Sequence, residues 1–189
     1  MADEDQRLEN LEKNVQYLLD RQAILDVCAR NARGCDRHDS DLLASAYHKD
    51  GVDEHGFAVN AGPDYPGWAN KQHAQGSQQH LHHVTHQICE IDGDEAHCES
   101  YVIGLFLNRN GKSAHILSGR YIDRLERREG EWKIALRRST VEVFMQADAA
   151  MLTSPQFAQL GFLKGKQDKS DLSYLRPLTL EDTPEGHRW

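Results

Sequence analysis

Histidine is the residue type whose number and spacing most readily suggest chemistry in this chain. The chain contains eleven histidines, and five of them cluster together: His73, His80, His82, His83 and His86. If this region is an extended strand, its side chains alternate between two faces, so His82 and His86 share one face. Imidazole titrates near neutral pH, so such a pair offers a general base together with a general acid or a hydrogen-bond donor.

The same cluster suggests a metal site as the alternative. Zinc sites usually add a cysteine or a carboxylate to histidine at a recognisable spacing, and no such spacing is evident here. We therefore expect neither a metal nor a cofactor. His73 and His80 are assigned to a solvated loop.

The composition excludes several classes of partner. Lys and Arg sum to 22 against 30 Asp and Glu, which gives a formal net charge of −8 at pH 7. Most faces of such a protein repel a polyanion, so nucleic acid is not expected as a partner. The apolar runs are far shorter than the roughly 20 residues of a membrane-spanning helix. The polar N-terminus lacks signal-peptide character, and the four cysteines form no CxxC pair, so we expect a cytoplasmic protein with reduced thiols.

The elements that must position these side chains begin with helices. A chain of 189 residues fits one domain with a single core. Apolar residues recur every three or four positions over residues 3–33, which predicts a long helix that ends at Gly34. Asp39 offers an N-cap for a second helix that ends near Gly51. Residues 52–79 are rich in Gly, Pro and polar residues, which indicates a loop with one short helix around Trp68–Gln75.

Strands follow from His82 onward. The predicted strands are His82–Ile91, Glu95–Asn108, Ser113–Arg127 and Glu131–Phe144, with turn signals DGD, NG and EG between them. Helices followed by an antiparallel meander predict an α+β fold, in which a curved sheet packs on the N-terminal helices and leaves a ligand pocket. We assign residues 1–146 to this domain. Residues 147–189 are expected to form an extension that packs on the domain or on a neighbouring subunit.

Three segments of the chain resemble the SnoaL-like branch of the nuclear transport factor 2-like superfamily. They are ILDVCARNARGCD at residues 24–36, HHVTHQICEI at residues 82–91 followed by DGD, and GRYIDRLERREGEWKIALRR at residues 119–138. The resemblance implies a cone-shaped α+β barrel, in which a bent antiparallel sheet wraps around a long N-terminal helix. Members of this branch include scytalone dehydratase, hexachlorocyclohexane dehydrochlorinase, polyketide cyclases and lyases acting on lignin-derived aromatic dimers. Their common step is proton abstraction next to a leaving group, without a metal or an organic cofactor.

The resemblance also implies catalytic residues. In several of these enzymes an Asp at the end of the first helix orients a His at the beginning of a strand, and Asp36 and His82 occupy the matching positions. The carboxylate fixes the tautomer of the ring and stabilises the imidazolium, which leaves the other ring nitrogen free to take a proton. Arg137 matches a pocket arginine that assists the leaving group or holds an anion. Its strand position equally allows a cross-strand ion pair with Glu99 or Asp123.

Further residues are expected to contact the substrate. His86 stands where the branch frequently has Asn or a small polar residue, four positions after the base. Tyr101 on a central strand and Trp68 in the covering loop are candidates for packing an aromatic ring, and Tyr47 and Asn31 are further pocket candidates.

The predicted function is that of a cofactor-independent lyase. The expected substrate is a hydroxylated aromatic small molecule, such as a lignin-derived one, from which the enzyme eliminates water or a small carbonyl fragment such as formaldehyde. The branch that the chain resembles also includes a bile-acid 7α-dehydratase. Gly104 stands where that enzyme carries an Asp, and a Tyr of the branch is replaced near Asn31. Both differences argue against dehydration of a steroid. The alternatives are a polyketide or steroid isomerase or cyclase, and a non-catalytic subunit like the small subunit of ring-hydroxylating dioxygenases. A homodimer or homotrimer is expected.

Overall fold

A single long helix, α1 (Ala2–Asp36), opens the chain in a computed structural model that describes residues 2–180 and 186–189. The prediction that this helix ends at Gly34 is wrong, because Gly34 serves packing and not termination. A Cβ at Gly34 would lie 2.7 Å from the Cβ of Leu43 in α2 (Ser40–Ala44). Asp39 caps α2 as predicted, by accepting a hydrogen bond from the backbone N–H of Leu42. The close approach of the two helices leaves Asp36 at the end of α1.

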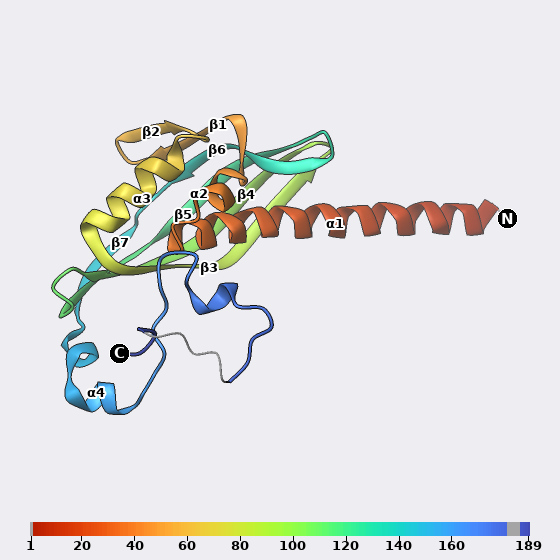
Figure 1. Cartoon of the computed structure of the whole chain (residues 1–189). Helices are drawn as coiled ribbons and strands as arrows, with labels where there is room; N and C mark the ends of the chain where they lie inside the picture. Colours follow the sequence, from red (N-terminus) through yellow and green to blue (C-terminus); the bar gives the residue numbers. More distant parts are fainter. Residues whose placement is uncertain (1, 181–185) are drawn as a thin grey trace.

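The two halves of α1 have different surroundings. In its second half Ile24, Val27 and Cys28 are buried against the sheet. The first half projects away from the rest of the molecule (Figure 1), and Leu11 and Leu18 on it are more than half exposed. Only the second half therefore belongs to the domain that contains the site.

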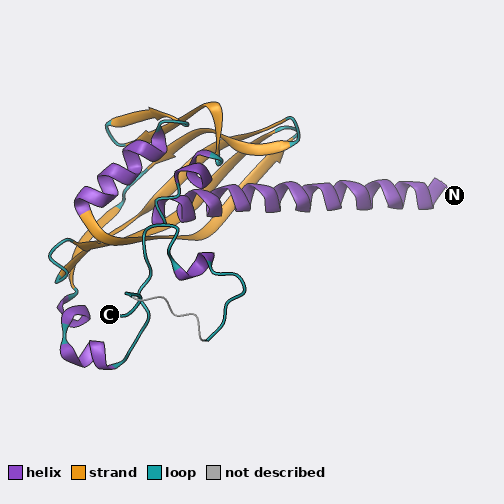
Figure 2. Ribbon diagram, viewed as in Figure 1, coloured by secondary structure: helices purple, strands orange, loops and turns teal. Residues whose placement is uncertain are grey.

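Seven strands form one curved, open sheet (Figure 2). They are β1 (Tyr47–His55), β2 (Ala58–Ala61), β3 (Ser77–Asp92), β4 (Glu95–Asn108), β5 (Ser113–Arg128), β6 (Glu131–Ser139) and β7 (Val143–Asp148). Their order is β2-β1-β6-β5-β4-β3, and β7 pairs with β5. The predicted α+β fold and the antiparallel meander from β3 to β6 are confirmed. The one parallel pair among the described strands joins β1 to β6.

The sequence prediction is wrong in three stretches. The second helix ends at Ala44 and not near Gly51, because β1 begins at Tyr47. The short helix predicted around Trp68–Gln75 is present as α3 (Tyr65–Gly76), but the rest of residues 52–79 is not mainly a loop, since it contains the end of β1 and all of β2. The pattern concealed β1 because its inward positions include Asp53, which is fully buried, in place of an apolar residue. The predicted last strand is divided into β6 and β7, because the strand is interrupted at residues 140–142 before the chain continues in the same direction along the first part of β5.

The core lies between the helices and the concave face of the sheet. Its most buried apolar side chains are Ile24, Leu43, Leu125 and Ile134. After β7 the chain forms η1 (Ala150–Thr153) and α4 (Pro155–Gln159) beside one end of the sheet (Figure 1), and then η2 (Leu172–Tyr174), which contacts the α1–α2 junction. Within the described ranges, no helix has the length and apolar character needed to cross a membrane.

Candidate active site

Asp36 and His82 are in direct contact. Oδ1 of Asp36 lies 2.7 Å from Nδ1 of His82, and the two carboxylate oxygens accept the backbone N–H of His82 at 3.1 and 3.0 Å. The side chains are only 8% exposed for His82 and 11% for Asp36. The carboxylate at the end of α1 thus fixes both the position and the orientation of the ring on β3. A neutral ring in this contact carries its proton on Nδ1, which leaves the lone pair on Nε2.

His82 lines a cavity of about 410 Å³ on the concave side of the sheet. The strand side of this cavity is mainly apolar and is formed by Val102, Gly104, Phe106 and Leu117. Gly104 lies directly opposite His82 in the β3–β4 ladder, and a Cβ on it would come 2.7 Å from the Phe106 ring. The glycine therefore allows Phe106 to fold over the strand beside the imidazole.

A second carboxylate–imidazole pair borders the same cavity, and the sequence analysis missed it. His55 lines the cavity, and its Nδ1 lies 3.4 Å from Oδ1 of Asp53 and 3.1 Å from Oγ of Ser139. Asp53 is fully buried, and its Oδ2 accepts a 2.6 Å hydrogen bond from the Tyr47 hydroxyl. The signal was present, because Asp53 and His55 stand two positions apart and so share a face once residues 47–55 are read as a strand.

Tyr121 and Thr140 add hydroxyl groups to the cavity lining. The Tyr121 hydroxyl has no hydrogen-bond partner among the described residues, and burial raises the pKa of Tyr121 strongly, so the group is a neutral donor. Phe57, in the turn between β1 and β2, is almost completely exposed and stands at the edge of the cavity. The cavity therefore combines apolar walls with a few polar groups, as small-molecule sites commonly do.

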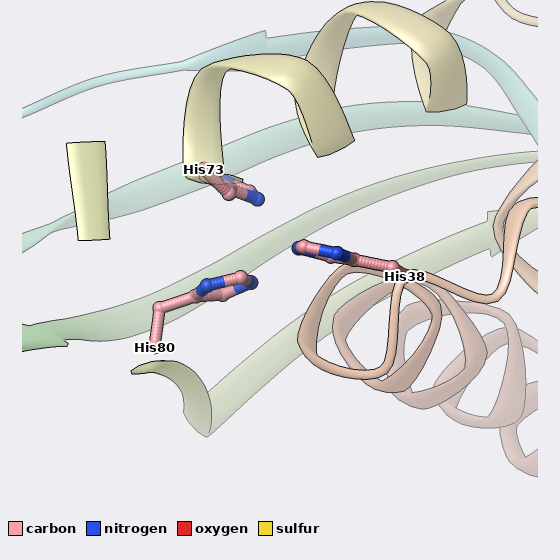
Figure 3. A group of neighbouring side chains, drawn as sticks. All are labelled: His38, His73 and His80. Atoms are coloured by element: carbon pink, nitrogen blue, oxygen red, sulfur yellow. The ribbon is translucent and has the colours of Figure 1, made fainter. Parts of the chain in front are cut away.

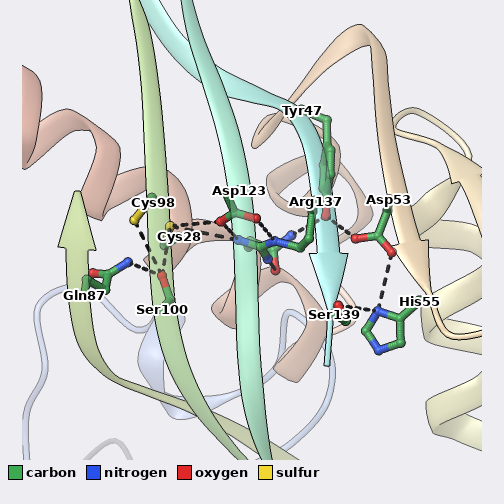
Figure 4. A network of polar contacts seen from close by, with 11 residues as sticks. Cys28, Tyr47, Asp53, His55, Gln87, Cys98, Ser100, Asp123, Arg137 and Ser139 are labelled. Atoms are coloured by element: carbon green, nitrogen blue, oxygen red, sulfur yellow. Dashed lines mark hydrogen bonds and ion pairs between the residues drawn. The ribbon is translucent and has the colours of Figure 1, made fainter. Parts of the chain in front are cut away.

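Arg137 does not line this cavity. Its side chain is 1% exposed and donates to both oxygens of Asp123, from Nε at 2.7 Å and from Nη2 at 2.6 Å. A third donor, Nη1, bonds Oδ1 of Asn31 at 2.7 Å, and the guanidinium lies 4.1 Å from the centre of the Tyr121 ring. Figure 4 shows this buried network, which continues through Tyr47 toward the cavity. Of the two readings from the sequence, the ion pair with Asp123 is the one that the structure contains.

The expected face shared by His82 and His86 does not exist. The β3–β4 register shifts between Val84 and Gln87, which is a bulge that turns the following side chains to the other face. His86 is consequently exposed, and its ring lies 6.4 Å from the ring of Tyr101, which is itself 47% exposed. Both residues lie outside the cavity that His82 borders.

The remaining predicted pocket residues lie behind the cavity lining. Tyr47 and Asn31 are buried and bonded to each other at 3.2 Å within the Arg137 network. Trp68 belongs to α3, where a short helix was predicted, but it does not line the cavity. Its ring lies 5.7 Å from that of His55, so it supports a cavity residue from behind.

His73 and His80 are also placed differently from the prediction of a solvated loop, since His73 is half-buried in the last turn of α3 and His80 is buried on β3. Burial lowers the pKa of His73 to about 2 and that of His80 to about 4, with further lowering from neighbouring imidazoles. Together with His38 they form a group that could hold a metal ion, and a second such group combines Asp36, His80 and His82. All of these residues lie next to the contact between Asp36 and His82.

Known proteins with this architecture define the family. The sequence matches the SnoaL-like domain over residues 16–138, which is more than half of the chain. The chain therefore belongs to the SnoaL-like family, within the nuclear transport factor 2-like superfamily. No curated protein matches it.

Several solved structures are similar. The hexachlorocyclohexane dehydrochlorinase LinA-type3 from Novosphingobium barchaimii LL02 is 22% identical with a TM-score of 0.66, over 71% of this chain and 94% of that one. A scytalone dehydratase-like protein from Novosphingobium aromaticivorans DSM 12444 is 20% identical with a TM-score of 0.62, over 71% and 91%. A protein of unknown function from Mycobacterium tuberculosis is 28% identical with a TM-score of 0.60, over 67% and 74%. At these identities the two enzyme-like structures establish the fold alone.

Proposed function

We propose that this protein is a small-molecule enzyme of the lyase or isomerase type, in which His82 is the base and Asp36 positions it. The observation that carries the proposal is the 2.7 Å contact between Nδ1 of His82 and Asp36 at the wall of a 410 Å³ cavity. Nε2 of His82 has no partner among the described residues, so it remains available for a substrate proton. Two of the similar solved structures are named as a dehydrochlorinase and as a scytalone dehydratase, and a reaction of the same class is consistent with the site of this chain.

The proposed reaction begins with proton abstraction. Nε2 of His82 takes a proton from a carbon or a hydroxyl of the substrate, and the released electron pair forms a new double bond as the bond to the leaving group breaks. Asp36 stabilises the resulting imidazolium through Nδ1. His55 lies in the same cavity, and in its protonated form it gives a proton to a departing oxygen so that water leaves. The neutral Tyr121 hydroxyl supplies a hydrogen bond to the negative charge that develops on the substrate.

The substrate class follows from the walls of the cavity. Val102, Phe106 and Leu117 offer apolar contact, whereas His55, Tyr121 and Thr140 offer a few polar groups. This combination favours a hydroxylated aromatic compound, and the reaction would expel water or a small carbonyl fragment such as formaldehyde. Isomerisation or cyclisation would use the same base and would differ only in which bond forms.

The test is a turnover screen of the full chain against hydroxylated aromatic dimers and related polyketide and steroid alcohols, with products followed by mass. We expect turnover by the wild type and loss of turnover in His82→Ala. His83→Ala is the matched control, because it removes an exposed imidazole from the neighbouring position of β3. Full activity in His82→Ala would overturn the assignment of the base. A product of unchanged mass would favour the isomerase alternative.

A further inference from the structure

Three histidines from separate segments converge on one point beside the proposed site (Figure 3). His38 comes from the turn between α1 and α2, His73 from the last turn of α3, and His80 from the first part of β3. The ring centres lie 4.3 Å apart for His73 and His80, and 5.3 Å apart for His38 and His80. One nitrogen of each ring lies within 4.8 Å of a nitrogen of each of the others.

The hydrogen bonding of this cluster is incomplete. Nε2 of His38 and Nδ1 of His73 are buried, and neither has a hydrogen-bond partner among the described residues. Buried polar atoms are normally paired, so two unpaired ring nitrogens in one histidine cluster need an explanation. His38 also has a φ of 46°, a left-handed conformation that is uncommon for a residue other than glycine and is often found at functional sites.

We propose that His38, His73 and His80 bind one divalent transition-metal ion of the zinc class. Neutral imidazole is the preferred ligand of zinc, copper, nickel and iron, and three histidines with one open position for water form a known zinc ligand set. Zn–N bonds of about 2.0–2.1 Å require the ring nitrogens to move somewhat closer together than they are here. His80 must also exchange one of its present contacts. These are the Cys35 carbonyl at Nε2, and the Gln167 side-chain amide and the Ser77 hydroxyl at Nδ1.

The alternative group of Asp36, His80 and His82 is the weaker candidate. Asp36 and His82 already satisfy each other through three hydrogen bonds, so an ion there would have to break them. An ion at the three histidines leaves that contact intact. An ion at this site would connect the α1–α2 turn, α3 and β3, and it would bind β3 two residues before His82. It would therefore fix the position of the strand that carries the proposed base. The ion takes no part in the proposed reaction, and its binding can be tested without a substrate.

The experiment is a titration of tag-free, EDTA-treated full-length protein with Co²⁺, followed by its visible absorption, and with Zn²⁺ by calorimetry. We expect one ion per chain for the wild type and an affinity at least about tenfold lower in His73→Ala and His38→Ala, since loss of even an outer-sphere partner commonly costs that much. His83→Ala and His86→Ala are matched controls, because both remove exposed imidazoles from β3. Zn²⁺ should also raise the Tm of the wild type, but not that of His73→Ala.

Three results would overturn the proposal. One is wild-type affinity retained in both His38→Ala and His73→Ala while circular dichroism shows that both are folded. Another is loss of binding in His83→Ala or His86→Ala, which would assign the ion to surface histidines. If Asp36→Asn abolishes binding but His73→Ala does not, the site is the group around His82 and this assignment is wrong.

A second, independent observation concerns the projecting half of α1. Leu8, Leu11, Val15 and Leu18 follow the alternating three- and four-residue spacing of a coiled-coil seam, and they are 46–61% exposed. The residues by which α1 packs on its own domain are Ile24, Val27, Cys28 and Asn31. At 100° per residue the two sets lie about 180° apart around the helix axis, so the domain does not obstruct the seam.

We infer that this seam pairs with α1 of a second copy of the chain, in parallel and in register. In that arrangement Arg7 of one copy flanks the seam opposite Glu12 of the other, which gives complementary charge on both sides of the pair. An unpaired helix would leave the four apolar side chains in water, whereas pairing buries them. The inference gives a dimer contact that is separate from the proposed active site.

Analytical ultracentrifugation of wild type and of the Leu11→Asp/Leu18→Asp double variant tests this pairing. We expect a dimer for the wild type and a monomer for the variant, with Lys13→Asp on the outer face as the control that remains dimeric. Oxidation should crosslink Leu8→Cys faster than Glu9→Cys, because only position 8 faces its own copy in a parallel pair, and the four native cysteines are buried. A monomeric wild type, an unchanged mass of the double variant, or equal crosslinking would overturn the inference.

Discussion

Among the carboxylates that contact a cation or an imidazole, Asp123 and Asp36 have surroundings that give them different roles. Asp123 binds Arg137 in a pair that water does not reach, since the two side chains are 0% and 1% exposed. Asp36 binds His82 at the wall of a cavity. The first pair is placed to determine stability, and the second to determine the chemistry, so substitutions in the two pairs should separate these properties.

Asp123→Asn is expected to lower the free energy of unfolding by about 3–5 kcal/mol, because it leaves the Arg137 charge buried without its partner. Arg137→Met should cost a similar amount for the converse reason. The double variant Arg137→Met/Asp123→Asn should lose less than the sum of the two, and urea unfolding of all four proteins measures the coupling. Additive losses would contradict a tight buried pair.

Asp36→Asn is expected to reduce turnover by about a hundredfold or more while changing stability little. The amide can donate to Nδ1 of His82, which would favour the tautomer with its proton on Nε2, so the base would lose its free lone pair. The ¹⁵N shifts of His82 report the tautomer without any substrate, and Asp36→Glu is the control that keeps the charge. An unchanged tautomer together with unchanged turnover would remove Asp36 from the mechanism.

At the residue scale, the sequence located the contact between Asp36 and His82 but not the rest of the site. The motif match was sufficient for that pair, because Asp36 stands at the end of α1 and His82 lies on the strand β3 beside it. His86 was misplaced because a bulge after Val84 changes the face of every later residue, and no alternation pattern reveals a bulge. His55 was missed because its strand has Asp53 where an apolar residue is usual.

At the element scale, the α1–α2 junction positions Asp36, and Gly34 is the residue that permits it. Gly34→Ala would bring a Cβ within 2.7–2.8 Å of Leu43 Cβ and of its backbone N and Cα, which cannot move aside as a flexible side chain can. We expect a loss of about 1–3 kcal/mol in the free energy of unfolding, measured by urea unfolding.

Gly67→Ala in α3 is the control. Its Cβ would meet nothing within 4 Å, so that variant should be neutral or about 0.5–1 kcal/mol more stable. Equal stabilities of the two variants would contradict the packing role of Gly34.

Asp20 fastens α1 to the hairpin of β5 and β6 at the point where the helix leaves the domain. Its Oδ1 accepts from Nε1 of Trp132 at 2.9 Å, from Arg127 at 2.7 Å and from Gln16 at 3.1 Å. Burial by itself raises the pKa of Asp20, but the hydrogen bonds from Trp132 and Gln16 and the Arg127 charge outweigh it, and the net effect is a lowered pKa.

The contribution of Asp20 to stability should therefore depend on pH. A carboxyl group with a lowered folded-state pKa stabilises fully above its ordinary value of 3.8, and the contribution is lost as the pH falls through the folded-state pKa. Asp20→Asn should cost about 1 kcal/mol at pH 7 and progressively less below about pH 4. Urea unfolding of both proteins across this range is the measurement, and a difference that grows on acidification would contradict the sign.

The helices and strands with the most regular hydropathy pattern were predicted most accurately. β4 and the predicted N-cap of α2 were correct to the residue, because alternation and capping chemistry are local signals. β1 could not be found, since it pairs in parallel with β6, which follows it by some eighty residues, and long-range partners leave no local trace.

At the scale of the whole molecule, the chain after β7 returns to the helices that carry Asp36. The Tyr174 hydroxyl donates to Oδ2 of Asp39 at 2.8 Å, and Asp171 lies 3.3 Å from Nε of Arg37. The side-chain amide of Gln79 on β3 donates to the carbonyl of Gly165 at 2.6 Å. These contacts fix the chain next to both Asp36 and His82. Arg37 directly follows Asp36, and Gln79 precedes His82 by three residues.

Removal of residues 149–189 is therefore expected to weaken the domain. The deleted segment borders a cavity of about 440 Å³ with Leu105, Leu107 and Ile116 of the sheet, so the truncated chain exposes an apolar surface and should bind a hydrophobic dye. We expect its Tm to fall by at least about 2–4 °C, the shift that 1 kcal/mol produces in a domain of this size.

The oligomeric mass of the truncated chain should not change, since the contacts lie within one chain. Tyr174→Phe removes only one hydrogen bond and should give a smaller decrease. An unchanged Tm without dye binding would show that the segment does not support the domain, whereas a changed mass would indicate that it packs on a neighbouring subunit instead.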